Sequence, residues 1–159
     1  MLSSRWIQGP AGDCLANHSA AHTAGSDSPG RRSGPLIVSV TDFTSDAYRD
    51  LPGIMRRGFA LRRRWPHLDG AVGMWLWATP LTRRCGAVSV WTGRRAMAEF
   101  VRLPEHVAIM DAYRERGTIR SVIWEYESSD VPRIRRDAEA WLMSADRCRA
   151  AREVPRQAG

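Results

Sequence analysis

Four segments of this chain are rich in apolar and β-branched residues, and each of them predicts a strand. The four segments are 36–43 (LIVSVTDF), 71–79 (AVGMWLWAT), 86–92 (GAVSVWT) and 118–127 (TIRSVIWEYE). Between them, apolar side chains repeat at helical spacing. The first helix should begin after Thr44 or Ser45 and run to about Trp65, and the second, over about 94–116, is broken at Pro104. The expected order is β-α-β-β-α-β, a ferredoxin-like α+β fold with a four-stranded antiparallel sheet.

The second predicted strand is apolar on both of its faces. Trp75 and Trp77 point to one side, whereas Val72, Met74 and Leu76 point to the other. The two helices of such a fold cover only one face of the sheet. We therefore expect the other face to be buried against a partner, in a homodimer.

The segments that flank this pattern differ from it in composition. Residues 1–35 are rich in Gly, Ser, Ala and Pro, which predicts a disordered leader before a domain over 36–128. Residues 129–159 should form a further helix and a tail. Asp130 is the expected N-cap of that helix and Pro132 lies in its first turn. We expect the helix to pack on the domain or across the dimer.

The formal charge of +7 raises the question of nucleic-acid binding. All 24 basic residues are arginine, and they occur as scattered pairs and triplets without a basic block or a nucleic-acid motif. Basic charge of this kind supports only non-specific attraction to phosphate. We therefore predict no nucleic-acid partner.

Cysteine usage and hydropathy indicate a cytoplasmic protein. Cys14, Cys85 and Cys148 are odd in number and far apart, which argues against a disulfide framework. No apolar run reaches the roughly 18–20 residues that span a bilayer, and the N-terminus lacks a signal-peptide core. We therefore expect no membrane partner. The sequence also lacks a nucleotide-binding glycine motif, a P-loop and a CxxC pair, so we expect no metal and no cofactor.

The run from Gly86 to Met110 (GAVSVWTGRRAMAEFVRLPEHVAIM) carries a family resemblance. An alternating strand ends at Trp91, a helix follows directly, and Pro104 divides that helix in two. This run resembles the third strand and second helix of the dimeric α+β barrel proteins, the superfamily of the antibiotic-biosynthesis monooxygenases. The resemblance implies that two sheets close face to face in a dimer, and that oxygenation proceeds without a cofactor.

His106 is the leading catalytic candidate. The monooxygenases that the chain resembles commonly carry two histidines on the second helix; aligned through Trp91, one falls on His106 and the other on Phe100. A neutral imidazole beside an apolar pocket can act as a general base on a phenol or quinol. Alternatively, His106 hydrogen-bonds to the backbone near Pro104 and caps the second half of the helix. Asp42 is the one acidic residue expected to face the same cleft, unless it only caps the first helix.

Large apolar side chains could wall this cleft for a flat aromatic ligand. The expected substrate-binding residues, which could also be ordinary core residues, are Phe59, Trp75, Trp77, Trp91, Phe100, Met110, Tyr113 and Trp124. Heme-degrading enzymes of the same fold use Trp and His where, on the alignment above, this chain has Phe100 and Met110. That difference argues against heme.

The sequence therefore predicts a cofactor-independent, monooxygenase-like enzyme that acts on an aromatic or polyketide-type small molecule of secondary metabolism. The alternative is a non-catalytic dimeric barrel that binds a small hydrophobic ligand. A heme-binding protein is the less favoured third possibility.

Overall fold

The computed structural model describes residues 1–12, 34–127 and 130–153, with side chains described as far as Ser144. The chain divides into two units, Met1–Ser129 and Asp130–Gly159. The first unit contains the sheet and the helices that surround the candidate site. Each unit is described by itself below.

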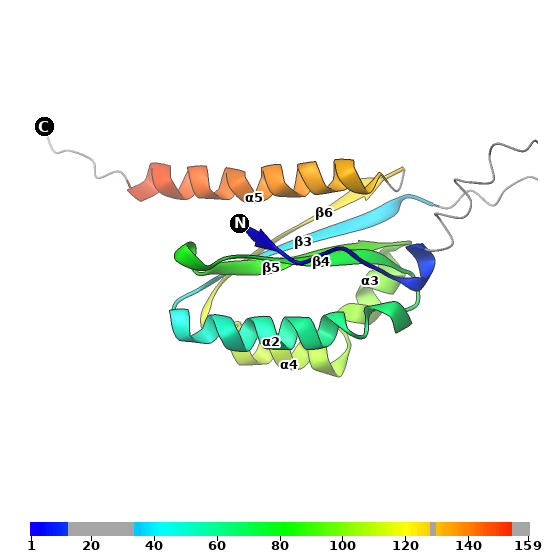
Figure 1. Cartoon of the computed structure of the whole chain (residues 1–159), viewed down its shortest axis with the longest axis horizontal. Helices are drawn as coiled ribbons and strands as arrows, with labels where there is room; N and C mark the ends of the chain where they lie inside the picture. Colours follow the sequence, from blue (N-terminus) through cyan, green and yellow to red (C-terminus); the bar gives the residue numbers. More distant parts are fainter. Residues whose placement is uncertain (13–33, 128–129, 154–159) are drawn as a thin grey trace, which may run out of the picture. The chain divides into compact units, whose positions relative to one another are not determined.

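The first unit is built on an antiparallel sheet with the strand order β4-β5-β3-β6. Three helices, α2, α3 and α4, lie on one face of this sheet (Figure 1). The bounds are β3 (Leu36–Ser45), α2 (Leu51–Arg62), β4 (Ala71–Thr79), β5 (Arg84–Trp91), α3 (Arg94–Val101), α4 (Pro104–Tyr113) and β6 (Gly117–Tyr126). Short 3-10 turns occupy Tyr48–Asp50 (η1), Trp65–His67 (η2) and Pro80–Thr82 (η3). The predicted ferredoxin-like α+β fold is confirmed.

Proline and glycine set two of the boundaries. Pro104 is the first residue of α4, where its missing N–H is not needed by the helix, so the chain turns between α3 and α4 at this point. Gly70 has φ of 72°, a left-handed conformation that L side chains rarely adopt. It turns the chain from η2 into β4.

The N-terminal residues extend the sheet. Strands β1 (Leu2–Ser3) and β2 (Ile7–Gln8) both pair with β4, and the ring of Trp6 lies over Gly73, 5.7 Å from that of Trp75. The prediction of a disordered leader is therefore wrong for residues 1–12, and residues 13–33 lie outside the described residues. Pairing with β1 and β2 satisfies backbone groups that an edge strand would leave open. Strands of two residues carry no periodic signal, so the sequence pattern missed them.

The two faces of the sheet carry different sets of apolar side chains. On the face toward the helices, Ile37, Met74 and Leu76 form a buried cluster with Trp65 and Trp91. The strand register places the other apolar residues on the opposite face, because successive side chains alternate. These are Val38, Val40, Trp75, Trp77, Val88 and Val90.

The second unit is one long helix, α5 (Val131–Glu153). The Asp130 carboxylate accepts a hydrogen bond from the Arg133 backbone N–H at 3.0 Å, so the predicted N-cap is confirmed. Ile134, Ala138 and Leu142 follow at intervals of four residues and share one face of the helix. No helix among the described residues is long and apolar enough to cross a membrane.

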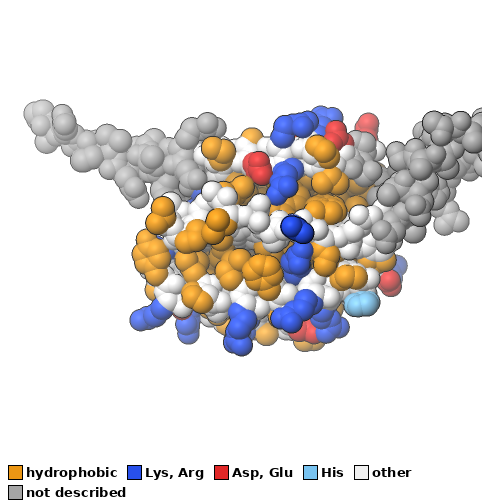
Figure 2. Space-filling model, in the orientation of Figure 1, with side chains coloured by type: hydrophobic (Ala, Val, Ile, Leu, Met, Phe, Trp, Pro, Cys, Tyr) orange, Lys and Arg blue, Asp and Glu red, His pale blue; other side chains and the backbone are white. Residues whose placement is uncertain are grey.

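The surface shows how the positive charge is distributed. On the face drawn in Figure 2, basic side chains occur in several separate places, a number of them along the lower edge, with apolar groups between them. This scatter agrees with the sequence, in which the arginines form no block.

Candidate functional site

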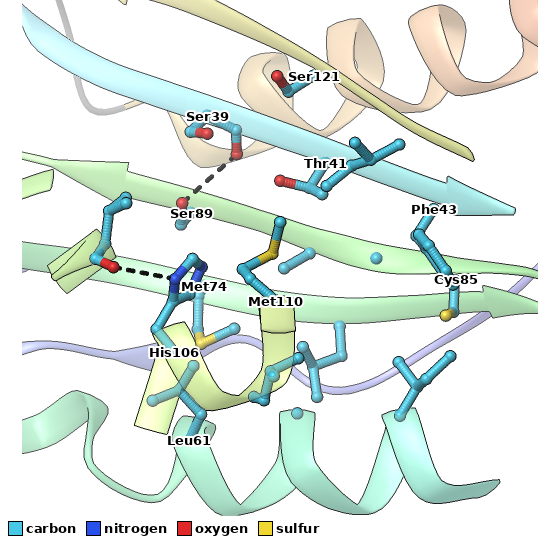
Figure 3. Close-up of a pocket in the computed structure, with 18 of the residues that line it drawn as sticks. Ser39, Thr41, Phe43, Leu61, Met74, Cys85, Ser89, His106, Met110 and Ser121 are labelled. Atoms are coloured by element: carbon cyan, nitrogen blue, oxygen red, sulfur yellow. Dashed lines mark hydrogen bonds between the residues drawn. The ribbon is translucent and has the colours of Figure 1, made fainter. Parts of the chain in front are cut away.

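A cavity of about 350 Å³ lies between the sheet and the three helices of the first unit. Strands β3 to β6 form its floor, and side chains of α2, α3 and α4 form its roof (Figure 3). Most of the lining is apolar. The lining includes Phe43, Ile54, Met55, Gly58, Leu61, Met74, Leu76, Phe100, Ile109, Met110, Tyr113, Ile119 and Ile123. A site of this size and character suits a flat organic molecule.

Four hydroxyl side chains interrupt the apolar floor. Ser39 and Thr41 of β3, Ser89 of β5 and Ser121 of β6 all line the cavity (Figure 3). They share one face because Ser39 pairs with Ser89, and Thr41 pairs with Ser121. The Ser89 hydroxyl already accepts a hydrogen bond from the Trp91 indole N–H at 3.0 Å. A few convergent polar groups in an apolar pocket can fix the orientation of a ligand.

His106 lines the cavity from α4, with its ring directed toward the sheet (Figure 3). Its Nδ1 lies 3.1 Å from the carbonyl oxygen of Val101, the last residue of α3. A carbonyl oxygen can only accept, so Nδ1 carries the proton and the neutral ring keeps its lone pair on Nε2. Burial lowers the pKa of His106 from its ordinary value, and the hydrogen bond to Val101 opposes that shift.

This geometry is compatible with both predicted roles of His106, the structural one and the catalytic one. The hydrogen bond to Val101 is the backbone contact near the Pro104 break that a structural role requires. The same bond fixes the ring so that the other nitrogen remains free to accept a proton. The hydrogen bond to Val101 is therefore compatible with a role of Nε2 as a general base.

An aromatic cluster closes one end of the cavity. The Phe100 ring lies 5.0 Å from the His106 ring, 5.6 Å from the Trp65 ring and 5.0 Å from the Trp91 ring, between centroids. Trp65 and Trp91 are themselves 4.5 Å apart and fully buried. Such tilted ring pairs pack favourably.

Asp42 does not face the cavity. Alternation along β3 puts its side chain on the opposite face of the sheet from Ser39 and Thr41. There its carboxylate accepts hydrogen bonds from Arg84 Nε at 3.0 Å and Arg84 Nη2 at 2.9 Å, and from Arg120 Nη2 at 3.0 Å. The expectation that Asp42 faces the cleft is therefore wrong, because its charge is buried in an ion pair on the far side of the sheet.

Three predicted wall residues lie on that same opposite face. Trp75 and Trp77 of β4 and Trp124 of β6 are not among the residues that line the cavity. Their register pairs them with Val88, Gly86 and Val38 respectively, so the three tryptophan side chains lie on the face of the sheet opposite α2, α3 and α4. The prediction that these tryptophans wall the cleft is therefore wrong. In β4 both faces are apolar, so the sequence could not show which face meets the cleft.

The remaining predicted wall residues divide into two groups. Phe100, Met110 and Tyr113 line the cavity as expected. Trp91 lies on the correct face but packs behind Phe100 and is not part of the lining. Phe59 is also not part of the lining and is 40% exposed on α2, so its assignment to the wall was wrong.

Several lining residues were missed by the sequence pattern. The hydroxyls of Ser39 and Thr41 alternate with Val38 and Val40 in β3, a signal that could have identified one polar stripe on the sheet. Trp65 was placed only at the end of the first helix, although it borders the cavity.

Cys85 of β5 also lines the cavity. Burial, with a smaller contribution from the charge of Asp42, raises the pKa of the Cys85 thiol to about 11. The group is therefore a neutral thiol at pH 7 and a poor nucleophile. It acts as an apolar part of the wall.

Comparisons with known proteins support the fold. No protein-family model and no curated protein matches the sequence. A conserved protein from Methanosarcina mazei Go1 has a TM-score of 0.52 and 11% identity, over 60% of this chain and 96% of that one. A proposed antibiotic biosynthesis monooxygenase from Nitrosomonas europaea has a TM-score of 0.52 and 9% identity, over 58% and 90%. Another from Caulobacter crescentus CB15 has a TM-score of 0.50 and 10% identity, over 62% and 94%.

Identities this low establish a shared fold and leave the reaction open. The similar structures include two proposed antibiotic biosynthesis monooxygenases, so the fold that the sequence resemblance implied is confirmed.

Proposed function

We propose that this protein is a cytoplasmic, cofactor-independent oxygenase that acts on a flat aromatic carbon acid or phenol of the polyketide type. The observation that carries the proposal is the geometry of His106. An imidazole with a lowered pKa, a fixed tautomer and a free Nε2 borders an apolar cavity. Such a group is neutral at pH 7 and can remove an acidic proton from a ligand that shares its desolvated surroundings.

The proposed reaction converts a ring methylene and O2 into a ring carbonyl and water. His106 Nε2 takes one methylene proton, and the resulting carbanion forms a C–O bond with O2. The imidazolium returns its proton to the peroxide that forms. The second C–H proton then leaves as the O–O bond breaks, so that one oxygen atom stays in the product and the other departs as water. The methylene supplies all four electrons that reduce O2.

The hydroxyls on the cavity floor fit this substrate class. Ser39, Thr41 and Ser121 can donate hydrogen bonds to the oxygen atoms of an aromatic ketone or phenol, while the apolar roof contacts its ring face. Negative charge that develops on such an oxygen would be stabilised by these donors.

A non-catalytic ligand-binding protein is the second candidate. No carboxylate lines the cavity among the described residues, so His106 has no acidic residue beside it there. A binding protein needs only the apolar cavity and its hydroxyls. The two candidates differ in whether His106 is required for turnover.

Oxygen uptake tests the proposal. The wild-type protein, in the presence of a metal chelator, should consume O2 with 1,8-dihydroxyanthrone faster than the buffer blank. His106→Asn keeps an N–H donor for the Val101 carbonyl and removes the base, so it should retain stability and lose about 100-fold or more of the rate above the blank. His67→Ala, at an exposed position outside the cavity, is the matched control. Full activity in His106→Asn would leave only the binding role.

We also propose that two copies associate, as the family resemblance implies. Val38, Val40 and Val88, on the sheet face opposite α2, α3 and α4, are already fully buried within the single chain. The expectation that this face needs a partner to be buried is therefore wrong, and the dimer proposal rests on the resemblance.

A further inference from the structure

A glycine in the middle of α2 lines the cavity. Gly58 lies between Ile54 and Leu61, which line the cavity one turn before it and one turn after it. Glycine is among the least favourable residues in the interior of a helix, because it loses the most backbone freedom on folding. Its place in this roof therefore calls for a reason.

The packing of the protein does not require glycine at this position. A Cβ atom at Gly58 would lie 3.7 and 3.9 Å from the two methyl groups of Leu76, which are ordinary contact distances. The other glycine of α2 differs, because a Cβ atom at Gly53 would lie 2.5 Å from the Tyr113 hydroxyl oxygen and would force that ring to shift. The fold thus explains Gly53 and leaves Gly58 unexplained.

A methyl group at position 58 would point toward the floor of the cavity. Leu76, which it would meet, belongs to that floor and pairs with Ala87, and Ala87 pairs with Thr41. Thr41 in turn pairs with Ser121 of β6, which is exposed (Figure 3). A row of side chains therefore crosses the floor from beneath Gly58 to the outer strand. At its inner end, Gly58 above and Ala87 below are both small.

We infer that Gly58 determines the size of the ligand, because it keeps open the space that the inner ring of a three-ring aromatic molecule occupies. The inference deepens the proposed function and rests on it. Ala87 and Ser121 are two strand spacings apart, about 10 Å, which is comparable to the length of three fused rings. A two-ring molecule can lie beside the hydroxyls of Thr41 and Ser121 without reaching Gly58.

Gly58→Ala tests the inference with two probes of different length. 1,8-Dihydroxyanthraquinone has three fused rings and no methylene to oxidise, whereas 1-naphthol has two fused rings. We expect Gly58→Ala to weaken binding of the three-ring probe by about tenfold relative to 1-naphthol, as measured by calorimetry, because one carbon too many in an apolar pocket has an effect of this order. The same change should raise Tm by roughly 1–4 °C, since alanine favours the helix.

Ala60→Gly is the matched control. Ala60 is exposed on the same helix and is not part of the cavity lining. The reverse substitution there should lower Tm by a similar amount and leave the ratio of the two affinities unchanged. The control separates an effect on helix stability from an effect on the cavity.

The outcomes distinguish the inference from the proposed function. If Gly58→Ala raises Tm and leaves the ratio of affinities unchanged, Gly58 does not determine ligand size, while the cavity remains a ligand site. If Gly58→Ala lowers Tm, the fold itself requires the glycine and the inference is wrong. If the wild-type protein does not bind 1,8-dihydroxyanthraquinone, the proposed function fails, and the inference fails with it.

Discussion

Replacing Asp42 should destabilise the fold and leave the cavity intact. The Asp42 and Arg84 side chains are each only 1% exposed and form a two-point ion pair, with Arg120 as a third member. The Arg84 guanidinium also lies 5.4 Å from the centre of the Trp77 ring. Asp42→Asn removes the negative charge at nearly constant shape. Arg84 then remains buried without its counter-charge.

The magnitude follows from the burial of the pair. Removal of one partner from a buried ion pair typically costs 3–5 kcal/mol, and the oxygen that Asn retains places this change near about 3 kcal/mol. For a chain of this size, each kcal/mol lowers Tm by roughly 2–4 °C, so the expected drop is roughly 6–12 °C. Asp111→Asn, in an exposed pair with Arg114, is the matched control and should change stability by less than about 1 kcal/mol.

Urea unfolding of four proteins measures the effect: wild type, Asp42→Asn, Arg84→Met and the double variant. The double variant should cost less than the sum of the single changes, because the two residues interact directly. Affinity for 1,8-dihydroxyanthraquinone should stay within about twofold of wild type in Asp42→Asn at a temperature where the variant is folded. A stable Asp42→Asn variant that has lost ligand binding would show that Asp42 serves the cavity after all.

Three further predictions concern pH, the N-terminus and assembly. Burial lowers the pKa of His106 in the folded state, so the unfolded chain binds the proton more readily and the free energy of unfolding should fall as the pH drops below about 6.5. His106→Asn should flatten this part of the pH profile measured by urea unfolding. An unchanged profile would contradict the assigned environment of His106. Deletion of residues 1–12 should lower Tm by several degrees, because β1, β2 and Trp6 cover β4, and an unchanged Tm would show that this pairing contributes nothing. Light scattering at micromolar concentration should give twice the chain mass of 17.9 kDa, and a monodisperse monomer would end the dimer proposal.

Strand and helix periodicity predicted the order of elements, but it could not assign the sheet faces. In β4, Trp75 and Trp77 alternate with Met74 and Leu76, and both sets are apolar enough to be buried. Only the three-dimensional register shows which set meets the helices. Asp42 was misplaced for the same reason, since its position in β3 alternates with the hydroxyl residues that face the cavity.

Other features depend on contacts that no local pattern records. Strands β1 and β2 are stabilised by pairing with β4, about 70 residues along the chain from them. His106 was predictable because its helical spacing with Ile109 and Met110 places all three on the face that lines the cavity.

Isotope labelling tests the central claim most directly. The wild-type protein would be given 1,8-dihydroxyanthrone and ¹⁸O2 in a single turnover with chelator present, and the quinone product analysed by mass spectrometry. We expect one labelled oxygen atom in the product, formed at a rate well above the blank and reduced to the blank in His106→Asn. Equal rates of labelled product with wild type, His106→Asn and no protein would contradict an oxygenase that uses His106 as its base.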